Sequence, residues 1–163
     1  MNAKATITES REVGAFDRIT LKGYGKLVVT QGEENSLTVE AHKAILPYIV
    51  TEVEDGELVL RMDKGWWERL IDSLSSPRIV YRATVRELTG LRMAGAGRVN
   101  ASDIETEHLT LRLSGAGNME VTALTAERLD AKLSGAGNMK VTGQVAEQHI
   151  AISGAGNYNA REL

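Results

Sequence analysis

The segment Leu113–Val121 (LSGAGNMEV) recurs along the C-terminal half of the chain and decides the fold. Close copies occupy residues 93–101 (MAGAGRVNA), 133–141 (LSGAGNMKV) and 152–160 (ISGAGNYNA). The first glycines of the four copies lie 20, 20 and 19 residues apart. A fixed interval of this length indicates one small structural unit stacked on copies of itself.

Apolar and polar residues alternate strictly on both sides of each Gly-Ala-Gly. Before the turn, Leu109, Leu111 and Leu113 alternate with Thr110 and Arg112. This period of two is typical of a half-buried strand. A second alternation follows each turn, and a third apolar position recurs near residues 104, 124 and 145. Three short strands in each unit of about 20 residues predict an all-β fold, a β-solenoid whose coils pair in parallel.

Two glycines flank the alanine of each turn. Glycine adopts a positive φ at almost no cost, whereas most other residues do not. We therefore expect these glycines to form structural corners, where valine would cost about 1–3 kcal/mol through backbone strain. They are Gly95, Gly97, Gly115, Gly117, Gly135, Gly137, Gly154 and Gly156.

Asparagine follows the turn at one register, as Asn118, Asn138 and Asn157, with Arg98 in the first copy. Stacked amides can hydrogen-bond from one strand to the next, which favours a structural Asn ladder. A row of ligand-binding amides is the alternative. Glu120 and Lys140 stand one unit apart at outward positions, where a weak ion pair is expected.

The N-terminal half lacks the glycine signature. Its strand-like segments include a hairpin with a turn at Asp55-Gly56. A chain of 163 residues suits one domain. We interpret residues 1–163 as a single domain in which residues 1–90 form an irregular cap and residues 91–163 form the coils.

A tryptophan-containing segment interrupts the cap. Trp66 and Leu70 are spaced for one face of a short amphipathic helix, with Trp67 and Ile71 beside them. Such a helix either covers the core or presents an interaction patch made of these four residues.

Composition excludes several classes of function. The net charge is −3 and there are no basic runs, so nucleic acid is not an expected partner. The chain has no cysteine, which excludes disulfides and thiolate metal sites. No apolar stretch reaches the roughly 18 residues of a membrane helix, and residues 1–20 contain no apolar leader.

These motifs together resemble the head-GIN domain family, also called putative auto-transporter adhesin or DUF2807. The resemblance rests on residues 11–19, on Val28–Gly32 and Leu37–Ala41, on the hairpin Val53–Leu58, and on the repeated Ser-Gly-Ala-Gly-Asn. It implies a right-handed parallel β-helix in an exported or envelope-associated bacterial protein. No catalytic residues follow from it, because the family defines none.

A search for catalytic groups finds no active-site pattern. His42, His108 and His149 are scattered, without a carboxylate or serine at a suggestive spacing. We therefore expect no enzyme, no metal and no cofactor, and predict a non-catalytic scaffold for binding, adhesion or assembly at the bacterial cell envelope. A cytoplasmic location stays open. The alternative is a carbohydrate-active β-helix enzyme with a loop-built site, which would need clustered carboxylates in a deep groove.

The last unit predicts self-association. Its strand edge, within Ile150–Ala160, has no following unit to pair with, and unpaired edges are templates for another chain. We expect a dimer through this end, with the Trp66-Trp67 segment as a second contact and a protein or glycan as a further partner.

Overall fold

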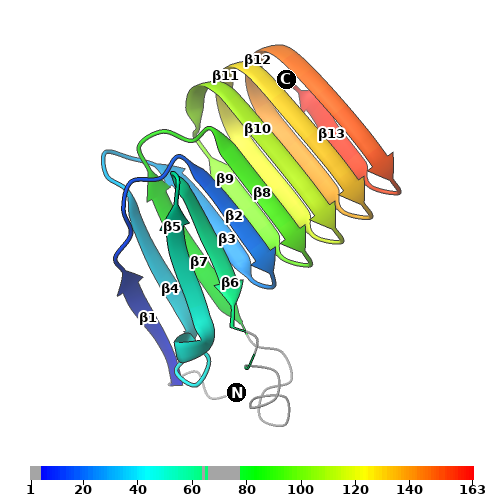
Figure 1. The fold of residues 1–163 in the computed structure, drawn as a ribbon. Coiled ribbons are helices and arrows are strands. Elements are labelled where there is room, and N and C mark those ends of the chain that lie inside the picture. Colours follow the sequence, from blue (N-terminus) through cyan, green and yellow to red (C-terminus); the bar gives the residue numbers. More distant parts are fainter. Residues whose placement is uncertain (1–4, 64, 66–77) are drawn as a thin grey trace.

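A computed structural model describes residues 5–63, 65 and 78–163 (Figure 1). The described residues form one 13-stranded sheet and include a short 3-10 helix, η2 (Leu46–Tyr48). The N-terminal half supplies β1 (Thr6–Arg11), β2 (Arg18–Gly23), β3 (Lys26–Gln31), β4 (Ser36–His42), β5 (Ile49–Glu54), β6 (Glu57–Met62) and β7 (Ile79–Val85). The remainder supplies β8 (Gly90–Gly95), β9 (Arg98–Ser102), β10 (Glu105–Gly115), β11 (Asn118–Gly135), β12 (Asn138–Gly154) and β13 (Asn157–Glu162). The candidate patch Trp66, Trp67, Leu70 and Ile71 lies outside the described residues.

The sheet is mixed. Its strands run in the order β1-β4-β7-β3-β9-β11-β10-β8-β2-β6-β5, with β12 and β13 continuing from β11. The pairs β1·β4, β4·β7 and β5·β6 are antiparallel, while the other pairs are parallel. The predicted right-handed parallel β-helix is therefore wrong, although the fold is all-β. The sheet wraps into a nearly closed barrel shape (Figure 1).

The barrel-shaped sheet has two opposite sides, here called walls, and long strands pass from one wall to the other. The first part of β11 pairs with β9, and its second part pairs with β10. Between them, at Ala123, φ is +54°, a left-handed conformation that turns the strand toward the other wall. The register between β11 and β12 shifts at the same place, between Val121 and Leu124. The bend therefore lets one strand belong to both walls.

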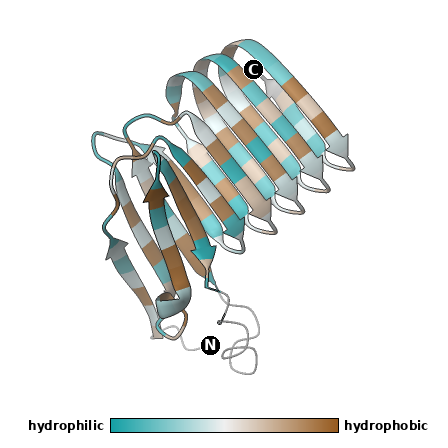
Figure 2. Cartoon of the chain, in the orientation of Figure 1, coloured by the Kyte–Doolittle hydropathy of each residue, from teal (hydrophilic) through white to brown (hydrophobic). Residues whose placement is uncertain are grey.

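Apolar rows from the two walls meet in one core. Figure 2 shows hydrophobic and hydrophilic residues alternating along the strands. One inward row, in register from β2 to β12, consists of Leu21, Met93, Leu113, Leu133 and Ile152. The first four are at most 1% exposed, whereas Ile152 is 49% exposed. The core is thus closed along most of the row and open at β12.

The corner glycines hold the units in register. The amide of Ala116 donates to the Gly95 carbonyl at 3.0 Å, and that of Ala136 donates to the Gly115 carbonyl at 2.9 Å. At Gly115, φ is +103°, and a β-carbon would collide with the Gly95 oxygen. The second glycine of each turn differs from the expectation: at Gly117 φ lies outside the left-handed region, and a β-carbon there would strike the Gly97 oxygen and the Met93 side chain.

The N-terminal strands extend the same sheet. The hairpin expected around Asp55-Gly56 is β5–β6. Arg11, at the end of β1, donates to the carbonyls of Ile49 at 3.0 Å and Leu46 at 3.1 Å. This largely buried guanidinium ties β1 to η2 and β5.

We expect Gly115→Ala to lower the free energy of unfolding by about 2–3 kcal/mol, because the new β-carbon meets both a positive φ and a backbone oxygen. Gly14→Ala is the matched control, since a β-carbon at Gly14 meets nothing within 4 Å. Urea denaturation measures the free energy of unfolding of both variants. Equal midpoints for Gly115→Ala and the control would contradict the steric role of the corner.

Candidate functional site

The outer surface of β9, β11, β12 and β13 carries the candidate site. Two polar rows run across these strands in register. We call this surface the Asn face; its rows are Arg98, Asn118, Asn138 and Asn157, and Asn100, Glu120, Lys140 and Asn159. The structure thus brings together the three asparagines that the sequence singles out.

Strand alternation and the corners place these side chains. Each of these four strands begins directly after a Gly-Ala-Gly turn, so the turn fixes which residue starts the strand. The intervening residues Met119 and Met139 point inward and are each 1% exposed. Their neighbours Asn118 and Asn138 consequently face solvent.

The amides form a hydrogen-bonded ladder. Asn138 Nδ2 donates to Asn118 Oδ1 at 3.0 Å, and Asn157 Nδ2 donates to Asn138 Oδ1 at 3.1 Å. An amide group has two N–H donors and two acceptor lone pairs. Each ladder bond uses one of these on each partner, so the row can hold its own geometry and still offer donors and acceptors outward.

The charges of the Asn face do not neutralise one another. Glu120 and Lys140 are directly opposite on β11 and β12, yet no ion pair within 4.0 Å links them in the described chain. The expected ion pair is therefore wrong. Arg98, at the head of the amide row, adds an exposed cation. The face offers amides with one carboxylate and two cations.

An open hollow of about 530 Å³ runs over the face. Its lining includes both rows, from Arg98 and Asn100 on β9 to Asn157 and Asn159 on β13. A few convergent polar groups in a concavity are what fixes the orientation of a ligand. The chemistry available is hydrogen bonding to hydroxyl, amide or carboxylate groups.

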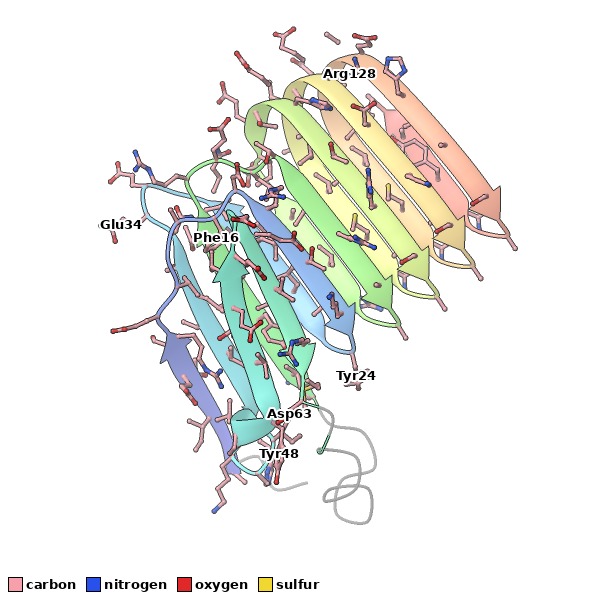
Figure 3. The ribbon with its side chains drawn as sticks, viewed as in Figure 1. Phe16, Tyr24, Glu34, Tyr48, Asp63 and Arg128 are labelled. Carbon is pink, nitrogen blue, oxygen red and sulfur yellow. The ribbon has the colours of Figure 1, made fainter. Side chains whose placement is uncertain are left out.

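Two of the three histidines have acidic partners that the sequence did not reveal. His108 contacts Asp130 on the neighbouring strand, and Arg128 Nε donates to the same carboxylate at 3.0 Å. The hydrogen bond from Arg128, assisted by His108, holds the pKa of Asp130 below its usual range. These groups lie within β11 and near the start of β10, and Figure 3 labels Arg128. Their register on β10 and β11 is the signal that could have paired them.

The second such pair lies on β12. His149 Nε2 and Glu147 Oε1 are 2.6 Å apart, and this hydrogen bond lowers the pKa of Glu147. His42 Nδ1 accepts a hydrogen bond from the Ala44 amide at 3.1 Å. The absence of acidic partners expected for all three histidines is therefore wrong for His108 and His149.

Four glutamates lie around a hollow outside the Asn face. An open hollow of about 600 Å³ is lined by Glu87, Glu105, Glu107 and Glu127, all of them exposed. A glycosidase holds its two carboxyls on either side of a bound sugar, with one of them shielded as an acid. The hollow is open rather than a deep groove. Among the described residues, no three His, Cys, Asp or Glu side chains are placed to hold a metal ion.

The sequence matches one known protein family over most of its length. Residues 15–163 match the family described as "Putative auto-transporter adhesin, head GIN domain" (DUF2807). The chain belongs to this family. No curated protein matches it. Within the described residues, no helix has the length and apolar character needed to cross a bilayer.

Several solved structures share this fold. A putative adhesin of Bacteroides fragilis is 18% identical with a TM-score of 0.67, covering 97% of this chain and 98% of its own. A putative adhesin of Parabacteroides distasonis is 17% identical with a TM-score of 0.68, covering 97% and 74%. A protein of Parabacteroides distasonis titled putative lipid binding protein is 15% identical with a TM-score of 0.62, covering 97% of each chain. At these identities the likeness shows the fold.

Asn138→Ala should lower the free energy of unfolding by about 1 kcal/mol, because it removes both ladder bonds of the central amide. Asn100→Ala, on the same face but outside the ladder, should stay within about 0.5 kcal/mol of the parent chain. Thermal denaturation measures the stability of the two variants and of the parent chain. Equal stability would show that the ladder bonds contribute nothing measurable.

Proposed function

We propose that this domain is a non-catalytic binding module for adhesion at the bacterial cell envelope, and that the Asn face is its contact surface. The observation that carries the proposal is the row of amides held in register by hydrogen bonds at 3.0 and 3.1 Å. A ligand finds such groups already ordered, so little conformational entropy is lost on binding.

Glycans suit this surface. Sugar hydroxyl groups both donate and accept hydrogen bonds, as amides do. Asn118, Asn138 and Asn157 repeat at the strand spacing of about 4.8 Å, so a chain of sugars laid across the strands meets equivalent groups repeatedly. Membership of an adhesin family supports both the binding role and export to the envelope.

The proposal is tested on a printed array of bacterial polysaccharides and peptidoglycan fragments. We expect the intact chain to bind a subset of these glycans, and Asn100→Ala/Lys140→Ala to weaken that binding about tenfold without touching the ladder. Thr8→Ala/Lys43→Ala is the control, since it removes one neutral polar side chain and one lysine from a hollow near β1.

Two results would contradict the proposal. The first is an intact, folded chain that binds no glycan on the array. The second is equal binding by the Asn-face variant and the control, which would place the contact elsewhere on the molecule.

We infer that the domain also assembles through β12. Its C-terminal part pairs with β11 on one side, while β13 covers only residues before Gly143 on the other. Ile150 and Ile152 are 37% and 49% exposed beside this edge. An antiparallel pairing of two copies centred on Ala151 sets Ile150 against Ile152 of the second copy, so that one contact satisfies the edge and buries both apolar side chains.

Light scattering at micromolar concentration tests this assembly. We expect a dimer for the 163-residue chain and a monomer for Ile150→Lys/Ile152→Lys, because edge lysines oppose strand pairing. Ile7→Lys, an exposed isoleucine on β1, should remain dimeric. A monomeric parent chain, or a dimer lost only in Ile7→Lys, would refute pairing through β12.

A further inference from the structure

The wall opposite the Asn face carries three cations in one row. Arg92 on β8, Arg112 on β10 and Lys132 on β11 are directly opposite one another in the parallel ladder. We call these three residues the basic row. The sheet spacing sets them about 4.8 Å apart along the row at the level of the backbone. Figure 1 shows β8, β10, β11 and β12 side by side in this wall.

The basic row faces solvent. Arg92, Arg112 and Lys132 are exposed, whereas the inward residues flanking them in sequence, such as Leu111 and Leu133, are at most 4% exposed. None of the three cations forms an ion pair with a carboxylate of the described chain.

The nearby acids are already engaged. Asp130, beside Lys132 in sequence, is bound by Arg128 and His108. Glu57 accepts from the Thr20 hydroxyl at 2.7 Å and lies 3.9 Å from Arg18. Like charges directly opposite on neighbouring strands repel and destabilise a sheet. Three in a row, without internal compensation, are therefore a cost to the fold that an external anion would remove.

Hydroxyl groups border the row. Ser114, Ser134 and Ser153 form the next outward row toward the corners, again in register, and Thr110 lies on the other side. A shallow depression of about 310 Å³ begins at Arg92 and Arg112 and includes Thr110. The surface thus carries a cation and a serine together on β10 and β11, a cation alone on β8 and a serine alone on β12.

We propose that the basic row is a binding site for an anionic polysaccharide, laid across the strands with its carboxylates or sulfates on Arg92, Arg112 and Lys132. The repeat of the surface at strand spacing is close to the length of a sugar residue in an extended chain, so successive anionic groups meet successive cations. The row of serines supplies hydrogen bonds for the sugar hydroxyls. The site is independent of the Asn face, which lies on the other wall.

Other polyanions fit less well. On β8, β10 and β11, the residues that border the cations include no aromatic side chain on which a base could stack. An anionic membrane would favour apolar side chains beside the cations, whereas serine and threonine border them.

Binding of alginate, a linear polymer of uronic acids, tests the site by isothermal titration calorimetry. We expect Arg92→Gln/Arg112→Gln/Lys132→Gln to weaken binding at least about tenfold, and added salt to weaken wild-type binding with a log–log slope of about −2, roughly 0.7 per cation neutralised. Lys43→Gln/Arg78→Gln/Arg86→Gln is the matched control; it removes the same charge from exposed positions outside both proposed surfaces and should bind like the parent.

Further arms separate the ligand classes. Arg92→Lys/Arg112→Lys, which keeps the charges, should retain binding, and neutral dextran should not bind the row. Equal loss in the row variant and the matched control would overturn the proposal. So would tighter binding of a thymidine oligonucleotide, or of vesicles of phosphatidylglycerol and phosphatidylcholine, through the same three residues.

Discussion

The hydrogen bond between corner backbones is the constraint on which the rest of the structure depends. The amide after the first glycine of each turn donates to the carbonyl of the equivalent glycine one strand away, at 2.9–3.0 Å in every copy from Ala96 to Ala155. The bond forms only where no β-carbon stands between the two chains. A sequence that places glycine at this point every 20 residues therefore sets the register of all the strands that follow.

The strand register determines which outward side chains lie next to one another on the surface. Because a one-residue slip would reverse every side chain, the same corners that align the buried leucines also align the outward residues. On one wall this produces the amide ladder of Asn118, Asn138 and Asn157; on the other it produces the basic row. The two proposed binding surfaces are thus consequences of one packing requirement, and both repeat at the spacing of the strands.

The local pattern was readable from the sequence, and the long-range pairing was not. Alternation at Leu109–Leu113 and the Asp55-Gly56 turn predict strands that are present as β10 and the β5–β6 hairpin. The interval of 20 residues says nothing about β1, β4 and β7, which lie outside it and pair antiparallel through contacts distant in sequence. That is why a purely parallel β-helix was the wrong expectation.

The candidate sites could likewise be predicted only where they depend on the local repeat. Asparagines at one register predict neighbouring amides, because parallel pairing carries residue i onto residue i+20. His108 and Asp130 escaped notice because they are 22 residues apart, one unit plus one alternate position along the strand. The basic row could not be predicted, because the sequence does not show that Arg112 and Lys132 lie on one wall while Glu120 and Lys140 lie on the other.

Native-state hydrogen exchange at the corner amides tests the central claim most directly. The side chains of Ala116 and Ala136 are exposed at the tips of the turns, yet their amides donate to Gly95 and Gly115. If these bonds set the register, both amides exchange only through global unfolding, as slowly as mid-strand amides such as that of Leu111. Exchange as fast as that of Glu34, in an exposed turn, would show that the corners open freely and that the register is set elsewhere.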